Sequence, residues 1–209
     1  MDKARLENFS DAVFAVAITL LALDLAVAGP GHGSFAHQLA DRWPSYAAYV
    51  VSFFIIGITW VNHHALFTTL AAIDRLLLFL NLTLLLFIVA IPFGTASIAA
   101  FLTGGGADAH LAAALYAAIL LGMALSFGAI LVWSLASAER RHDPLPPDIA
   151  HRALVRFSLG AVLYLIAIAV AFVSAVATLI LIAINAVYYI FEQTPGVHAE
   201  HIRAPHRDP

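Results

Sequence analysis

The sequence predicts an all-α membrane protein in which six helices cross the bilayer. Of its 209 residues, 62% are hydrophobic and 11% are charged, whereas an ordinary soluble domain carries about 25% charged residues. The mean hydropathy is +0.92. The apolar residues form long runs separated by short polar connections, and several runs reach the roughly 20 apolar residues that a spanning helix needs.

The first four predicted spans follow one another closely along the chain. They cover residues 8–28, 46–69, 76–102 and 110–136. The third span contains Pro92. Because proline leaves a carbonyl without its helical donor, we expect a kink there.

The last apolar run extends from Phe157 to Phe191 and contains no charged residue. Its roughly 35 residues are too many for one span of a hydrocarbon core about 30 Å thick, and they suit two short helices. We therefore expect a break at residues 173–175, where Ser174 favours a turn, although no glycine or proline marks it.

The basic residues predict the orientation of the spans. With six spans, Arg42 stands alone on one side, and the positive-inside rule makes the other side cytoplasmic. Both termini are then cytoplasmic in a multi-pass protein of the plasma membrane. We expect one membrane domain over residues 1–193 and a flexible cytoplasmic tail over 194–209. The cytoplasmic basic residues are Lys3, Arg5, Arg75, Arg140, Arg141, Arg152, Arg156, Arg203 and Arg207.

Composition argues against several functions. The net charge of -3 and the scattered basic residues argue against a nucleic-acid partner. Cysteine is absent, which removes disulfides, thiolate catalysis and cysteine-ligated metal sites. We expect no metal or other cofactor. A site at His63 and His64 is an alternative, but adjacent residues point about 100° apart on a helix, unlike the i, i+4 pair of a helical zinc site.

The first predicted span carries a narrow stripe of side chains. At 100° per residue, Val16, Thr19, Leu20 and Leu23 fall within an arc of about 100°. Asp11 lies on the far side, about 220° from Val16. The alternative for this stripe is ordinary packing against another helix.

Asp11 needs a partner within the protein, because an acid at membrane depth is costly. Arg5 is six residues away, which is outside the i, i+4 pairing distance on a helix. The end of the second span offers Trp60, His63 and His64 at a comparable depth. We expect a cluster of Arg5, Asp11 and one of the two histidines.

Two other interpretations of the N-terminal segment remain open. In the first interpretation, the helix begins late and Ser10 or Asp11 is its N-cap. In the second, the segment is a secretory signal with a cleavage site of small residues at Ala26, Val27 and Ala28. The acids at positions 11 and 24 interrupt the apolar region and argue against a signal.

The first two spans carry an ordered set of residues. In the first span these are Arg5, Phe9, Ser10 and Asp11, followed by Thr19, Leu20 and Leu21. In the second span they are Trp60, His63 and His64. This motif resembles that of the transmembrane protein 175 family of cation channels. Prokaryotic members of this family have six spans and a similar length, so the resemblance extends over nearly the whole chain, with the strong match in the first two spans.

The resemblance implies a homotetramer in the lipid bilayer that passively conducts K⁺ in preference to other monovalent cations. The four first helices line a central pore in this family. The hydrophobic constriction falls on Val16, with further lining at Thr19, Leu20 and Leu23, which is the stripe found on the helical wheel. The family often has Ile or Leu at the position of Val16, so the tightest ring falls at Val16 or at Leu20.

The resemblance also implies roles for the polar residues. Arg5, Ser10 and Asp11 belong to a structural network with Trp60 and the paired histidines. Asp24 falls near the extracellular mouth of the pore, where it attracts cations or is simply a solvated helix end. No stretch of the chain matches the TVGYG filter of ordinary potassium channels.

A secondary transporter is the main alternative function. Transporters commonly contain internal repeats, and the two halves of this chain show none. An intramembrane serine enzyme is a further alternative, but Ser126 lacks the Gly-x-Ser-x-Gly arrangement. We expect no enzymatic activity. Asn81, Thr83 and Asn185 lie within spans, and we expect them to form hydrogen bonds between helices.

Overall fold

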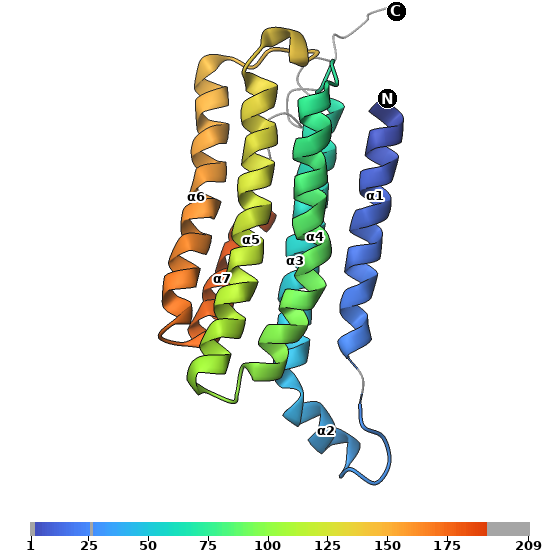
Figure 1. Ribbon diagram of the computed structural model, residues 1–209, viewed down its shortest axis with the longest axis vertical. Coiled ribbons are helices and arrows are strands. Elements are labelled where there is room, and N and C mark those ends of the chain that lie inside the picture. The colour runs from blue at the N-terminus through green and yellow to red at the C-terminus, as the bar shows by residue number, and fades with distance from the viewer. Residues whose placement is uncertain (1–2, 26, 192–209) are drawn as a thin grey trace, which may run out of the picture.

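The computed structural model describes residues 3–25 and 27–191 (Figure 1). Within these residues the secondary structure is helical, apart from one isolated antiparallel bridge between Leu70 and Arg141. The elements are α1 (Lys3–Leu20), η1 (Leu21–Asp24), α2 (Phe35–Asp41), α3 (Trp43–Thr68), α4 (Arg75–Phe101), α5 (Gly106–Leu135), η2 (Ala138–Arg140), α6 (Pro147–Ala171) and α7 (Ala175–Phe191), where η marks a short 3₁₀ helix.

The long helices run up and down beside one another as an antiparallel bundle (Figure 1). Helix α1 stands at one edge and packs against α3 and α4, while α5 lies against α4, α6 and α7. The start of α1, the α3–α4 turn and the α5–α6 connection lie at one end of the bundle. Helix α2 and the α4–α5 and α6–α7 turns lie at the other end (Figure 1).

The predicted all-α class with apolar spanning helices is confirmed. Five helices are long and apolar enough to cross a membrane: α1 with η1, α3, α4, α5 and α6. Helix α7 is apolar but only 17 residues long, so the sixth span stays a prediction.

The break predicted in the last apolar run is present. Helix α6 ends at Ala171 and α7 begins at Ala175. The Ser174 hydroxyl accepts a hydrogen bond from the Ala177 amide at 3.2 Å, which caps one of the free donors at the start of α7. Ser174 therefore marks the start of α7, although no glycine or proline does so.

The boundaries of the first span differ from those predicted. Helix α1 begins at Lys3 and ends at Leu20, and a 3₁₀ turn replaces the expected helix beyond it. The late start with Ser10 or Asp11 as N-cap is wrong, because both residues lie well inside α1. Ser10 instead donates its hydroxyl proton to the Leu6 carbonyl, four residues earlier, at 2.9 Å.

Two further expectations concern prolines and the C-terminal tail. Pro92 lies inside α4, and the kink expected there stays a prediction. Helix α6 begins at Pro147, ahead of the uncharged run, because proline in the first helical turn lacks only an amide that has no helical partner there. The predicted tail over 194–209 lies outside the described residues.

Helices α4 and α5 approach closely in the centre of the bundle. A Cβ atom on Gly122 would lie 2.2 Å from the Phe87 ring, so only glycine leaves room for that ring. Nearby, the Ser52 hydroxyl is 2.6 Å from that of Thr95 and 2.7 Å from that of Tyr116. Small residues and buried hydroxyl groups thus join α3, α4 and α5, as is typical of membrane helix contacts.

Candidate functional site

Helix α1 has one face turned to the protein and one face that its own chain leaves uncovered. The buried positions recur every three or four residues, the spacing that places side chains on one helical face. These buried residues are Leu6, Ser10, Phe14 and Ala17 of α1, with Leu21 of η1. They face α3 and α4, the two helices that α1 contacts.

A chain of hydrogen bonds fastens this buried face. The Asn81 side-chain amide in α4 donates to the Ser10 hydroxyl at 2.9 Å. The other end of that amide, Oδ1, lies 2.9 Å from Nε2 of His63 in α3. Because a carbonyl oxygen only accepts, this nitrogen of His63 is the donor. All three side chains are buried, so one network links three helices.

Aromatic rings hold His63 in position. Its ring stacks on Phe67 with centroids 3.9 Å apart and meets the ring of Phe14 at 5.4 Å. Phe14 belongs to the buried face of α1, so the network is both hydrogen-bonded and packed.

Asp11 lies at the edge of the buried face, half-buried, and its partner is Trp60. The indole Nε1 donates to Asp11 Oδ1 at 2.9 Å. His64 is exposed, and its ring is 6.5 Å from that of Trp60.

These contacts differ from the cluster expected for Arg5, Asp11 and a histidine. His63 turns toward Asn81, and His64 points elsewhere because successive helical residues diverge by about 100°. Among the described residues no ion pair joins Arg5 to Asp11. The spacing of the motif identified a second-span partner, but it could not show which residue meets the acid.

Asn81 is the network residue that the family motif did not include. Its prediction as an interhelical hydrogen-bond partner is confirmed. Thr83 instead donates to the Phe79 carbonyl of its own helix at 2.8 Å. Both side-chain polar atoms of Asn185 are buried without a hydrogen-bond partner.

The predicted stripe lies on the uncovered face. Val16, Leu20 and Leu23 are 54%, 38% and 73% exposed, and Thr19 between them is also exposed. Leu23 follows in the 3₁₀ turn, where residues three apart eclipse each other, so it continues the line of Leu20. Other helices expose apolar side chains as well, so exposure alone does not separate a pore face from a lipid face.

Thr19 has a defined hydroxyl orientation. It donates its proton to the Val16 carbonyl at 2.8 Å. The oxygen lone pairs therefore remain as acceptors on the uncovered face, and an acceptor is what a cation needs.

Asp24 lies at the opposite end of the helix from the N-terminus. It is exposed and borders a cleft of about 370 Å³ with Asp41 and Arg42. The acid thus shares its surroundings with one further acid and one base at this end of the bundle.

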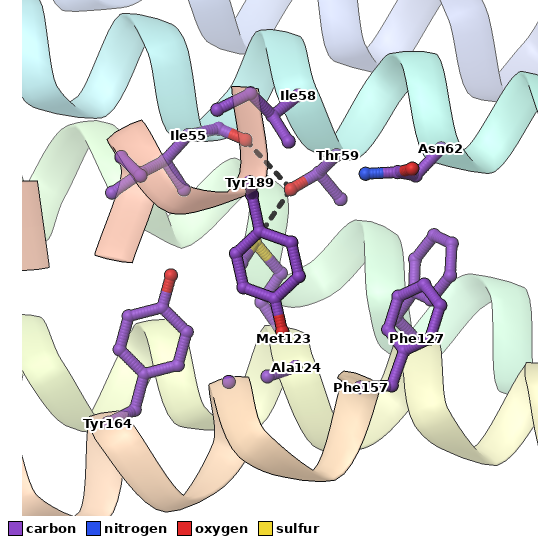
Figure 2. A pocket seen from close by; sticks show the side chains of 12 residues that line it. Ile55, Ile58, Thr59, Asn62, Met123, Ala124, Phe127, Phe157, Tyr164 and Tyr189 are labelled. Atoms are coloured by element: carbon purple, nitrogen blue, oxygen red, sulfur yellow. Dashed lines mark hydrogen bonds between the residues drawn. The ribbon is translucent and has the colours of Figure 1, made fainter. Parts of the chain in front are cut away.

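A second cavity, of about 60 Å³, lies between α3, α5, α6 and α7, away from α1 (Figure 2). Its polar lining includes Thr59, which donates to the Ile55 carbonyl at 2.7 Å. Tyr189 also lines it and donates to the Arg156 carbonyl at 2.8 Å. A space this small holds a few water molecules.

The described residues contain no group of three histidine, cysteine or acidic side chains arranged to hold a metal ion. Ser126, considered above as a nucleophile, donates its hydroxyl proton to the Gly122 carbonyl at 2.7 Å. Among the described residues, this hydroxyl makes no hydrogen bond to a histidine or acidic side chain.

Comparison with known proteins supplies the family. The family model for the endosomal/lysosomal potassium channel TMEM175 matches residues 5–92. A potassium channel of Streptomyces collinus is 47% identical over 93% of this chain and 94% of its own length. A potassium channel of Chamaesiphon minutus is 37% identical, with 83% of this chain and 86% of the relative covered.

Solved structures agree with the sequence comparisons. The crystal structure of a lysosomal potassium-selective channel TMEM175 homologue from Chamaesiphon minutus superposes with a TM-score of 0.79. It shares 32% identity, and the superposition covers 90% of this chain and 96% of that one. From the extent of these matches, together with the helical bundle and the first two spans, this chain belongs to the TMEM175 family of channels.

Proposed function

We propose that this chain is one subunit of a homotetrameric, potassium-preferring cation channel in the plasma membrane. Six helices of each subunit cross the bilayer, with both termini in the cytoplasm, and four copies of α1 surround a central pore. The observation that carries the proposal is the 47% identity to a potassium channel over nearly the whole chain. The uncovered stripe of Val16, Thr19, Leu20 and Leu23 on the otherwise fixed helix α1 supplies the candidate pore lining. The relatives named as potassium channels support K⁺ as the conducted ion.

Conduction is controlled by apolar rings. Four copies of Val16 and four of Leu20, one turn apart, surround the axis of the pore. A narrow apolar ring blocks ions by excluding water, and a modest outward movement wets it. No TVGYG filter is present, so ion preference arises from the dimensions and lining of this segment.

Thr19 contributes the polar part of the pore lining. Its proton is donated to the Val16 carbonyl, so four outward oxygens form a ring of acceptors between the apolar rings. These oxygens replace part of the hydration shell of a passing cation. Asp24 lies at the extracellular mouth, where its carboxylate raises the local concentration of cations.

The network around Ser10 has a mechanical role. Ser10, Asn81 and His63 fix the rotation of α1 about its axis, because a small rotation separates the hydrogen-bonding atoms. The Asp11 to Trp60 bond adds a second attachment closer to the exposed edge. Fixing this rotation keeps the stripe directed at the pore axis. Arg5 and His64 lie on exposed parts of this region, where they are available to a neighbouring subunit.

Purified protein in a planar bilayer tests ion preference, with K⁺ on one side and Na⁺ on the other. We expect a reversal potential displaced toward the potassium equilibrium potential. A secondary transporter would give no such current and would instead move a solute in a coupled manner in liposomes. That result would contradict the channel and favour the alternative.

Substitutions test the lining. Val16→Asn or Leu20→Asn introduces a polar ring that holds water, so we expect a leak current about tenfold or more above that of the unmodified channel. Val162→Asn is a matched control, because Val162 is a similarly exposed valine on α6. Equal currents in all three variants and the unmodified protein would show that the stripe is not the pore face.

A further inference from the structure

Arg141 is a buried cation without an acidic partner. The residue is 8% exposed, and the Nε of its guanidinium is buried without a hydrogen-bond partner. Among the described residues no ion pair includes it. Arginine keeps its charge in proteins, and a charge out of water is costly unless it is paired. Burial accordingly lowers the pKa of the Arg141 guanidinium.

The bridge between two connections explains why Arg141 is buried. The Ala71 amide donates to the Arg140 carbonyl at 2.9 Å, and the His142 amide donates to the Thr69 carbonyl at 3.0 Å. These bonds pair Arg141 with Leu70, and directly opposed residues of an antiparallel pair point to the same face. Leu70 is fully buried, so the backbone directs Arg141 inward with it.

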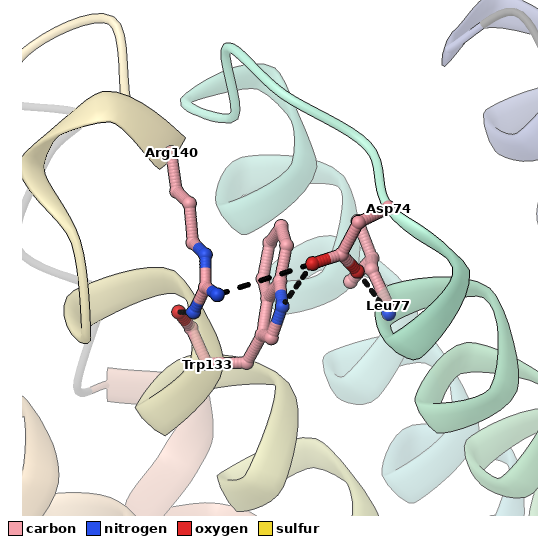
Figure 3. Close-up of polar contacts among 4 residues, drawn as sticks. All are labelled: Asp74, Leu77, Trp133 and Arg140. Atoms are coloured by element: carbon pink, nitrogen blue, oxygen red, sulfur yellow. Dashed lines mark hydrogen bonds and ion pairs between the residues drawn. The ribbon is translucent and has the colours of Figure 1, made fainter.

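Asp74, an acid at this end of the bundle, is already engaged (Figure 3). One of its oxygens accepts from the Leu77 amide at 2.8 Å, and the other accepts from the Trp133 indole at 3.0 Å. Arg140 lies 3.9 Å from that second oxygen. The Leu77 amide above all, with the Trp133 and Arg140 contacts, holds the pKa of Asp74 below its usual range.

Arg140 is the basic residue that lies beside Asp74. It donates to the Trp133 carbonyl at 2.7 Å, and its guanidinium lies 4.6 Å from the centroid of the Trp133 ring (Figure 3). Arg140 is therefore the base that meets Asp74. Among the described residues, neither Glu139 nor Asp143, each two residues from Arg141 along the chain, forms an ion pair with Arg141.

A second cation lies on the same bridge. The Lys3 ammonium donates to the Leu70 carbonyl at 2.9 Å and to the Thr68 carbonyl at 3.2 Å. Both of its partners are neutral. Lys3 thus places a second positive charge at the backbone of Leu70, at the end of the bundle where α1 begins.

We propose that Arg141 binds a phosphate group, that an anionic phospholipid headgroup supplies it, and that the Lys3 ammonium at the backbone of Leu70 adds to the positive charge at this end of the bundle. A guanidinium offers several donors in the planar arrangement that matches phosphate oxygens. Basic pockets between spanning helices at the membrane surface are where anionic headgroups bind. The site lies at the end of the apolar helices, and it does not depend on which face of α1 lines the pore.

Thermal unfolding of the full-length protein in mixed micelles tests the site. Micelles containing phosphatidylglycerol should raise the Tm by several degrees over micelles containing only phosphatidylcholine. Arg141→Gln should lose most of this shift, with apparent affinity for the anionic lipid about tenfold weaker, because charge-assisted hydrogen bonds to the phosphate are lost. Arg152→Gln is the matched control and should keep the shift, since Arg152 is exposed and pairs with Asp148.

Inorganic phosphate is the second probe and identifies the source of the group. A shift in Tm at millimolar phosphate without anionic lipid, lost in Arg141→Gln, would assign the same site to a free anion. An equal rise in Tm with anionic lipid in Arg141→Gln and in the unmodified protein would overturn the proposal, because the lipid would then bind without Arg141.

The unmodified protein gives a measurement that does not depend on whether a variant folds. Native mass spectrometry from micelles with equal amounts of the two lipids should retain phosphatidylglycerol in preference to phosphatidylcholine. Arg141→Lys, which keeps the charge but not the planar donors, should retain less than the unmodified protein. Equal retention of both lipids by the unmodified protein would overturn the site.

Discussion

Both faces of α1 carry apolar side chains, but the protein buries only one of them. Phe14 on the buried face is 1% exposed, whereas Phe9, five residues earlier, is 50% exposed. The buried face also carries Ser10, which is hydrogen-bonded to another helix, and the uncovered face carries Thr19, which is bonded only to its own helix.

This difference teaches what orients a helix in an apolar solvent. Lipid tails are as apolar as leucine, so hydrophobicity alone does not select which face of α1 meets the protein. Hydrogen bonds and close packing must select it. On α1, Ser10 and Phe14 fix the face that packs against α3 and α4. The uncovered stripe consequently faces away from these two helices.

The largest effect should come from removing the packed ring. Phe14→Ala leaves a cavity against His63, and we expect a loss of about 3 kcal/mol in the free energy of unfolding. Phe9→Ala is the matched control and should cost under about 1 kcal/mol. The measurement is reversible unfolding in micelles. Similar losses in both variants would mean that a neighbouring subunit covers Phe9. The difference in burial between the two faces would then hold only for an isolated subunit.

A smaller effect should follow from breaking the hydrogen-bond network. Asn81→Ala removes the bonds to Ser10 and His63, which should cost about 1.5 kcal/mol, since interhelical bonds in membranes are individually weak. Thr83→Ala, two residues away on the same helix, removes only a bond to its own backbone and should be close to neutral. The unfolding free energies decide this, and a loss in Thr83→Ala as large as that in Asn81→Ala would mean that the bonds of Asn81 to Ser10 and His63 contribute no particular stability.

The smallest effect should occur at the edge between the faces. Trp60→Phe removes the indole donor to Asp11, and because both groups are partly exposed we expect a loss of about 0.5 kcal/mol. Asp11→Asn in the same background should add little, since the two residues share one interaction. A double-mutant cycle measures that coupling. Fully additive losses would indicate that Asp11 has another partner, such as Arg5 of a neighbouring subunit.

Much of the local structure follows from the sequence. The helical class, the apolar runs and the break before Ala175 were predicted because they depend on composition and on neighbouring residues. The position of the stripe on the first span also needs only the helical repeat. The end of α1 at Leu20 was missed, because apolar residues continue beyond it and no proline or glycine stops the helix there.

Only the tertiary structure decided which polar groups meet. His63 bonds to Asn81 and Asp11 to Trp60 because of how α1, α3 and α4 are rotated against one another, and the sequence of one helix does not encode that rotation. The bridge from Leu70 to Arg141 joins connections far apart in the chain. The sequence therefore predicted Arg141 only as one of several cytoplasmic basic residues and gave no sign that it is buried. Composition and periodicity determine the helices, whereas long-range packing determines which of their side chains pair.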